Sequence, residues 1–154
     1  MTNLKNKTVC FCDHGLFVSF ARKLAPAFGK AYYYKPSGSA FRKSTDEKIG
    51  TGFPELERID TPLLKADQID LWVFLDLHMA DLQCFLSDHG ARVFGGRMGE
   101  EMETDRVEFK KYLKKLDLPV GPYEVVIGTE ALKRYLQSHS DVYVKNFGLT
   151  RGVF

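Results

Sequence analysis

The sequence predicts an α/β fold with a Rossmann-like parallel sheet, followed by a small partial α+β segment. The first observation is a set of short runs rich in apolar, aromatic and β-branched residues, as in buried strands. These runs occupy residues 8–12, 31–34, 71–75 and 92–94. The second is that apolar residues at helical spacing follow the first and third runs and stop at Gly29 and Gly90. Strands that alternate with helices are joined by right-handed crossovers, which makes the sheet parallel.

The first strand and helix form one unit with a polar turn between them. The run at 8–12 ends in Asp13, His14 and Gly15. Five apolar residues then recur at helical spacing and predict one buried stripe: Phe17, Phe20, Ala21, Leu24 and Phe28. The start of this helix faces the carboxyl end of the strand, where open α/β sheets place anionic ligands.

Two later strands also end in polar residues. The strand at 71–75 leads into Asp76-Leu77-His78, and the strand at 92–94 leads into Gly95-Gly96-Arg97. Because parallel strands share one carboxyl edge, the topology collects these residues there. The predicted substrate-binding residues are Asp13, His14, Gly15, Asp76, His78, Gly96 and Arg97.

The chemistry of this edge stays open at the level of sequence. Asp76 is either a ligand-binding carboxylate or the N-cap of the following helix. His14 and His78 are either proton carriers or simple polar contacts beside helix starts. No Ser-His-Asp order, metal-ligand spacing or carboxylate pair stands out, which argues against an independent hydrolase. We therefore assign no catalytic residue.

A long polar stretch, residues 35–54, follows the second strand. It is rich in glycine, serine, proline and basic residues. Loops of this length in compact domains are lids, binding segments or mobile linkers. A flexible insertion and a substrate-facing segment both fit the composition.

Composition narrows the classes of function. The chain has 154 residues, 44% hydrophobic and 27% charged, which suffices for one well-buried domain. A net charge of +2 does not favour nucleic acid as a partner, and no apolar run approaches membrane-spanning length. Three cysteines argue against a disulfide scaffold or a zinc site, and Cys10 and Cys12 are expected to form a small buried thiol pair on one strand face. We expect a cytoplasmic protein.

The last third of the chain begins with a basic amphipathic helix. Its apolar stripe consists of Phe109, Tyr112, Leu113 and Leu116. Asp105 suits the first turn, and the Leu-Pro-Val sequence at 118–120 ends the helix. Beyond this break we predict a strand at 123–127, a helix capped by Thr129 and a strand at 142–145.

Lys145 ends the last predicted strand and precedes a loop that contains Gly148 and Gly152. The ammonium group supplies a point charge, and a loop with little side-chain bulk lets backbone N–H groups approach oxygens. Both features suit a polyphosphate. A solvated edge lysine followed by an ordinary turn is the alternative.

The order of these motifs resembles the first part of the ATP-grasp ligases. In that family an acidic-basic pair opens the helix before a Leu-Pro-Val break, and a lysine ends a strand before a glycine-rich loop. Asp105-Arg106, residues 142–145 and residues 148–153 occupy these positions. With the Gly-Ala-Arg-Val-Phe-Gly-Gly sequence at 90–96, the pattern is most similar to phosphoribosylamine-glycine ligases and related carboxylate-amine ligases.

This sequence departs from the family pattern at three points. Arg106 stands where many members have lysine, which keeps the charge but changes the donor geometry. The loop after Lys145 is shorter than usual, and its basic residue is Arg151. The first loop, at 13–16, is poorer in glycine than that of the family.

The resemblance implies a domain order. Residues 1–98 would form a Rossmann-like pre-ATP-grasp domain, 99–121 a connecting helix and linker, and 122–154 the incomplete beginning of the nucleotide-binding domain. The family's acidic magnesium ligands lie beyond this chain. We therefore expect a truncated chain, a fragment or a naturally short protein that is inactive alone.

The resemblance also implies an activity. Such ligases use ATP and magnesium to form an acyl phosphate that an amine then attacks, here in purine biosynthesis with small-molecule carboxylate and amine substrates. The implied cofactor-binding residues are Arg106, Lys145, Gly148, Thr150, Arg151 and Gly152. The alternative is a non-catalytic Rossmann-like module that binds a small anion or a protein through the 13–16 loop. The sequence identifies neither the substrates nor the oligomeric state.

Overall fold

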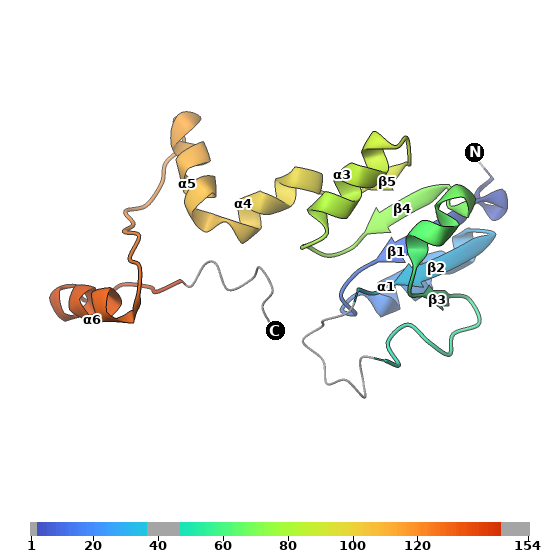
Figure 1. Cartoon of the computed structure of the whole chain (residues 1–154), viewed down its shortest axis with the longest axis horizontal. Helices are drawn as coiled ribbons and strands as arrows, with labels where there is room; N and C mark the ends of the chain where they lie inside the picture. The colour runs from blue at the N-terminus through green and yellow to red at the C-terminus, as the bar shows by residue number, and fades with distance from the viewer. Residues whose placement is uncertain (1–2, 37–46, 146–154) are drawn as a thin grey trace. The chain divides into compact units, whose positions relative to one another are not determined.

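The computed structural model describes residues 3–36 and 47–145. The chain divides into two compact units, Met1–Glu100 and Glu101–Phe154. The first unit contains a parallel five-stranded sheet in the order β3-β2-β1-β4-β5 (Figure 1). Its strands are β1 Thr8–Cys12, β2 Lys30–Tyr34, β3 Glu57–Ile59, β4 Leu71–Phe74 and β5 Val93–Phe94. The predicted α/β class with a Rossmann-like sheet is confirmed.

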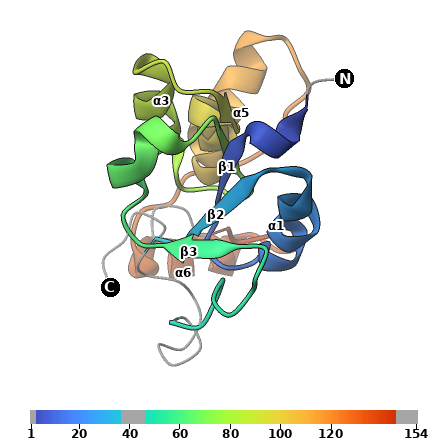
Figure 2. The same cartoon turned by 90° about the vertical axis from the view of Figure 1, so that its right-hand side faces the viewer.

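Among the described residues of the first unit, two α-helices and four short 3-10 helices accompany this sheet. The α-helices are α1 Val18–Leu24 and α3 Ala80–Asp88. The 3-10 helices are η1 Leu4–Asn6, η2 Ala25–Ala27, η3 Pro62–Gln68 and η4 Arg97–Glu100. Figure 2 shows α1 and α3 on opposite sides of the sheet, as in a doubly wound fold.

The two faces of the sheet carry separate apolar clusters because successive strand residues point to opposite sides. Cys10, Trp72 and Leu86 belong to the cluster on the α3 side, whereas Phe11, Ala21 and Val73 belong to that on the α1 side. Four of these side chains are fully buried. The core therefore forms two layers around a central β1.

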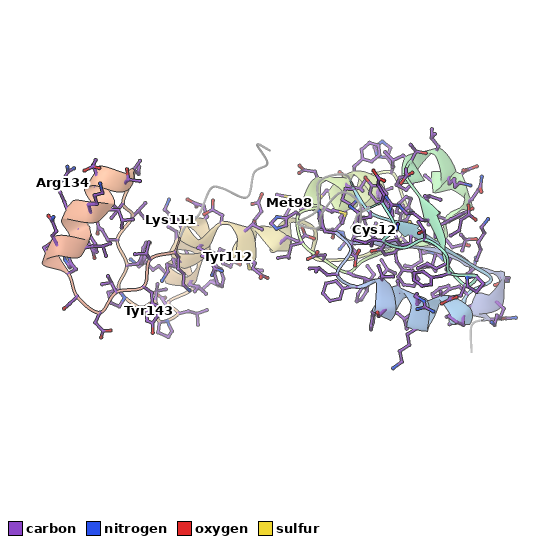
Figure 3. The ribbon with its side chains drawn as sticks, turned by 90° about the horizontal axis from the view of Figure 1, so that it is seen from below. Cys12, Met98, Lys111, Tyr112, Arg134 and Tyr143 are labelled. Carbon is purple, nitrogen blue, oxygen red and sulfur yellow. The ribbon has the colours of Figure 1, made fainter. Side chains whose placement is uncertain are left out.

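The predicted thiol pair on β1 is confirmed. Cys10 and Cys12 are fully buried, and their Sγ atoms lie 3.9 Å apart. Burial, and then the neighbouring Cys10, raises the pKa of the Cys12 thiol. Figure 3 shows Cys12 inside the first unit, so both thiols are packing residues.

The sequence prediction missed β3, and it assigned exposed residues to the buried stripe of α1. β3 reads Glu-Arg-Ile and stands at the end of the strand order beside β2, so it has the polar character of a short edge strand. In α1, Ala21 is fully buried, whereas Phe20 and the N-cap residue Phe17 are 48% and 40% exposed. The buried residue of α1 is therefore a small one, which lets the helix approach the sheet closely.

The second unit contains three helices in its described part: α4 Glu101–Thr104, α5 Arg106–Lys115 and α6 Thr129–Ser138. Asp105 caps α5, since its Oδ1 accepts from Val107 N at 3.1 Å and Glu108 N at 3.0 Å. Asp117 adopts a left-handed φ of 54°, and Leu118 N donates to Leu113 O at 3.0 Å. The helix thus ends in a turn before the Leu-Pro-Val sequence begins.

The strands predicted at 123–127 and 142–145 are wrong for this structure, which assigns no strand to either range. A strand needs a hydrogen-bonding neighbour, and none is present for these ranges among the described residues of the second unit. Instead, Tyr123 lies against α5, with Lys110 Nζ 4.8 Å and Lys114 Nζ 5.2 Å from its ring centroid. Figure 3 shows Lys111 and Tyr112 on α5. In residues 101–145 no side chain is buried.

No helix in the described part of the chain is both long and apolar enough to cross a membrane.

We predict that Asp70→Asn reduces the loss of stability at acidic pH. Asp70 Oδ1 pairs with Lys7 Nζ at 2.7 Å and its Oδ2 accepts from Thr8 N at 2.9 Å, which lowers the pKa of Asp70 below its ordinary value of 3.8. The stabilisation by these two contacts is fully present above pH 3.8. It is lost as the pH falls through the lowered pKa of Asp70. The difference between the urea midpoints at about pH 6 and about pH 3 should be smaller for Asp70→Asn than for the wild type. Equal acid sensitivity of Asp70→Asn and of the exposed control Asp67→Asn would contradict this.

Candidate functional site

The strand order places the candidate site between β1 and β4. From β1 the chain winds outward through β2 and β3, then returns to the other side of β1 with β4 and β5. The order therefore reverses between β1 and β4, and ligands of open α/β sheets bind at this point, outside the carboxyl ends of the strands. Cys12 pairs with Phe74, and Leu75 N donates to Cys12 O at 2.9 Å. The residues that follow these two strands consequently lie close together.

Three predicted substrate-binding residues meet here: His14, Asp76 and His78. His14 Nδ1 lies 3.5 Å from Asp76 Oδ2, and the rings of His14 and His78 are 6.0 Å apart between centroids at an interplanar angle of 77°. The side chains of His14 and Asp76 are 23% and 18% exposed. The cluster is therefore partly exposed to solvent.

His14 has an unsatisfied atom in the cluster. Its Nδ1 is buried and has no hydrogen-bond partner within the described residues. Asp76 uses its Oδ1 to accept from Leu77 N at 2.8 Å. It is not the N-cap of α3, since Met79 holds that position without a side-chain cap. The carboxylate is thus oriented by its own turn and faces His14.

His78 has a backbone conformation that is rare for its residue type. Its φ is 69°, in the left-handed region that non-glycine residues seldom adopt. Such residues persist where the surrounding structure holds them, and they cluster at functional sites. His78 is exposed, so its ring is presented to solvent.

Asp13 builds the loop and does not face a ligand. It is fully buried, and its carboxylate accepts from Gly15 N at 2.6 Å, Phe17 N at 2.5 Å and Tyr33 Oη. Burial, together with the hydrogen bond to Asp13, raises the pKa of Tyr33. Gly15 has a φ of 101°, which explains glycine at this position. The prediction that Asp13 contacts substrate is corrected, because its oxygens are occupied by the protein.

Arg97 likewise forms hydrogen bonds within the protein. Its backbone N donates to Gln83 Oε1 at 2.7 Å, and its guanidinium donates to Ser87 Oγ at 3.0 Å and Val93 O at 3.2 Å. These bonds fix the turn that contains Gly96 against α3. Arg97 therefore shapes this turn, and its side chain does not join the histidine cluster.

Two residues near this edge were not singled out from the sequence. Lys35 directly follows β2 and is only 3% exposed, with Nζ donating to Pro36 O at 2.9 Å. Its position after a strand is the signal that selected Asp76, so the same rule could have found it. Glu100 is 6% exposed and accepts from Met79 N at 3.2 Å. No local pattern marks it, because its partners lie 17 and 21 positions away.

The predicted nucleotide-binding residues belong to the second unit. Arg106 is the first residue of α5 and is exposed, as is Lys145. Lys145 is not carried by a strand. Gly148, Thr150, Arg151 and Gly152 lie outside the described residues.

The cluster offers one carboxylate oxygen and two imidazoles, which can donate and accept hydrogen bonds with a polar small molecule. In the described part of the chain no group of three His, Cys, Asp or Glu residues could hold a metal ion. Comparison with models of known protein families and with curated protein sequences gives no match. The assignment of a function rests on geometry and motif order.

Proposed function

We propose that this chain is the N-terminal part of an ATP-dependent carboxylate-amine ligase similar to phosphoribosylamine-glycine ligase. The observation that carries the proposal is the convergence of His14, Asp76 and His78 where the strand order reverses. In this proposal the first unit binds a substrate and the second unit begins the nucleotide-binding domain. The Asp105-capped helix that opens with Arg106 adds support, because it keeps the motif order of the family.

Each group has a proposed task. Asp76 accepts a hydrogen bond from an amine or hydroxyl of the substrate, and His14 and His78 bind its polar atoms beside it. Arg106 and Lys145 neutralise phosphate oxygens, for which two exposed cations are suited. ATP with magnesium would supply the phosphoryl group that activates the carboxylate. The described residues offer no ligand set for magnesium, so we derive no step through the ion.

Calorimetric titration of the protein encoded by the full reading frame tests the nucleotide part of the proposal. We expect magnesium-dependent ATP binding that weakens about tenfold or more in Arg106→Ala and in Lys145→Ala, since each removes a charged contact. Lys133→Ala is the matched control, because Lys133 is an exposed lysine of the same unit that pairs with Glu130. Absence of nucleotide binding, or equal losses in all three variants, would contradict the proposal.

The alternative is a non-catalytic module that binds a small molecule at the His14 cluster. It is favoured by one observation: the strand expected to carry Lys145 is not formed. This module would bind polar small molecules without any dependence on nucleotide. Histidine NMR signals that respond to a panel of carboxylates and amines, with no nucleotide binding, would select it over the ligase.

A further inference from the structure

A buried carboxamide and a buried carboxylate connect α3 to the end of the first unit. Gln83 in α3 is fully buried, and Glu100 at the end of η4 is 6% exposed. Gln83 Nε2 donates to Glu100 Oε1, and Gln83 Oε1 accepts from Arg97 N. Gly95 permits this approach, since a Cβ there would lie 2.2 Å from Gln83 Oε1. Both ends of the carboxamide therefore have fixed partners, which sets its orientation.

The second oxygen of Glu100 reaches the segment that carries His78. Glu100 Oε2 accepts from Met79 N at 3.2 Å. Met79 occupies the N-cap position of α3 and provides no side-chain cap, so Glu100 supplies an acceptor from another element. The Met79 N–H belongs to the planar peptide group directly after His78. Fixing that group restricts the backbone rotation of His78, whose φ is 69°.

We propose that Glu100 is a positioning residue for His78, acting through the Met79 amide and held in place by Gln83. The left-handed backbone of His78 is unfavourable for a residue with a Cβ, so an external contact is needed to hold it. This contact keeps the His78 ring beside that of His14. The importance for ligand binding rests on the proposed function, whereas the positioning itself is a property of the free protein.

Two variants test the proposal. Glu100→Gln places an amide against the Gln83 amide, and one buried donor or acceptor then loses its partner. The double variant Gln83→Glu with Glu100→Gln exchanges the two groups. In it, residue 100 still accepts from Met79 N and donates to residue 83, which still accepts from Arg97 N. The exchange should restore every hydrogen bond described above.

The measurements are amide hydrogen exchange of Met79 and the side-chain NMR signals of the histidines. In Glu100→Gln we expect the exchange rate of Met79 to rise about tenfold or more, because the single acceptor oxygen left at residue 100 is then contested by two donors, Met79 N and Gln83 Nε2. The side-chain NMR signal of His78 should shift in Glu100→Gln. In the double variant it should return to its wild-type position. His89 is the internal control: it lies at the other end of α3, with Nδ1 2.7 Å from Phe85 O. A general loosening of α3 would move both histidines.

The outcomes are distinct. A shift of His78 without one of His89, reversed in the double variant, supports positioning. Unchanged Met79 exchange in Glu100→Gln, parallel shifts of both histidines, or a double variant that resembles the single one overturns it. If Glu100→Gln does not fold, the double variant decides: wild-type His78 and Met79 signals support the proposal, and any other result overturns it. None of these measurements uses nucleotide, so failure of the ligase assignment would be seen separately.

Discussion

Replacing Asp13 by alanine should destabilise the protein by at least about 3 kcal/mol, because two backbone donors and one phenol lose a charged acceptor. The carboxylate is fully buried and accepts from Gly15 N, Phe17 N and Tyr33 Oη. Hydrogen bonds to a charged group contribute about 1.5–3 kcal/mol each, and water cannot replace the acceptor at a buried position without rearrangement. Urea unfolding followed by circular dichroism measures the loss.

Tyr33→Phe is the matched control for Asp13→Ala. It removes one donor to the carboxylate and leaves the two backbone bonds, so the expected loss is smaller, about 1.5–3 kcal/mol. Asp13→Asn should fall between the two, because its single carbonyl can accept from one backbone group while its amide faces the other donors. If Asp13→Ala and Tyr33→Phe lose the same stability, the carboxylate does not hold the loop.

The loop geometry also links Asp13 to the candidate site. His14 lies between Asp13 and Gly15, so the bonds that Asp13 accepts from Gly15 and Phe17 fix the backbone on either side of His14. The Asp13 carboxylate was predicted to meet a ligand because it follows a strand. Position at a sheet edge selects the right segment, but burial decides which of its side chains faces solvent. That decision depends on Tyr33, 20 positions away.

Strands with an apolar sequence were predictable, and the strand without one was not. β1, β2, β4 and β5 lie in or beside the core, and their composition marks them. β3 carries Glu57 and Arg58, so it is defined by pairing with β2 and not by its own pattern. The two strands expected in the second unit show the opposite error, since they were predicted from composition and are not formed. Their residues suit a sheet, but a strand also requires a neighbour, and local sequence does not report one.

The part of the site that follows from the sheet topology was predictable from the sequence. His14, Asp76 and His78 converge because right-handed crossovers bring the ends of β1 and β4 side by side, and alternation of strands and helices is visible in the sequence. Glu100 and Gln83 could not be found in this way. Their pairing depends on how η4 folds back on α3, which is a tertiary contact without a local signal.

Substituting alanine at Gly50 should destabilise the first unit by about 2–4 kcal/mol, the sum of an unfavourable left-handed backbone and overpacking. Gly50 has a φ of 78°, and a Cβ there would lie 2.2 Å from Tyr33 Cδ1. Tyr33 lies on β2 between β1 and β3 and is fully buried, so its ring has little room to move. Thermal unfolding should show the loss as a fall of roughly 4–8 °C per kcal/mol.

Gly52→Ala separates the two contributions to this effect. Gly52 has nearly the same φ, 79°, but a Cβ there would meet nothing within 4 Å. It should therefore show only the backbone cost of about 1 kcal/mol. The difference between the variants measures how tightly residue 50 packs on Tyr33, which donates to Asp13. If this packing supports the site, the His14 NMR signal shifts in Gly50→Ala and is unchanged in Gly52→Ala. Equal losses of stability in the two variants would instead show that the Tyr33 ring moves to accommodate the added carbon.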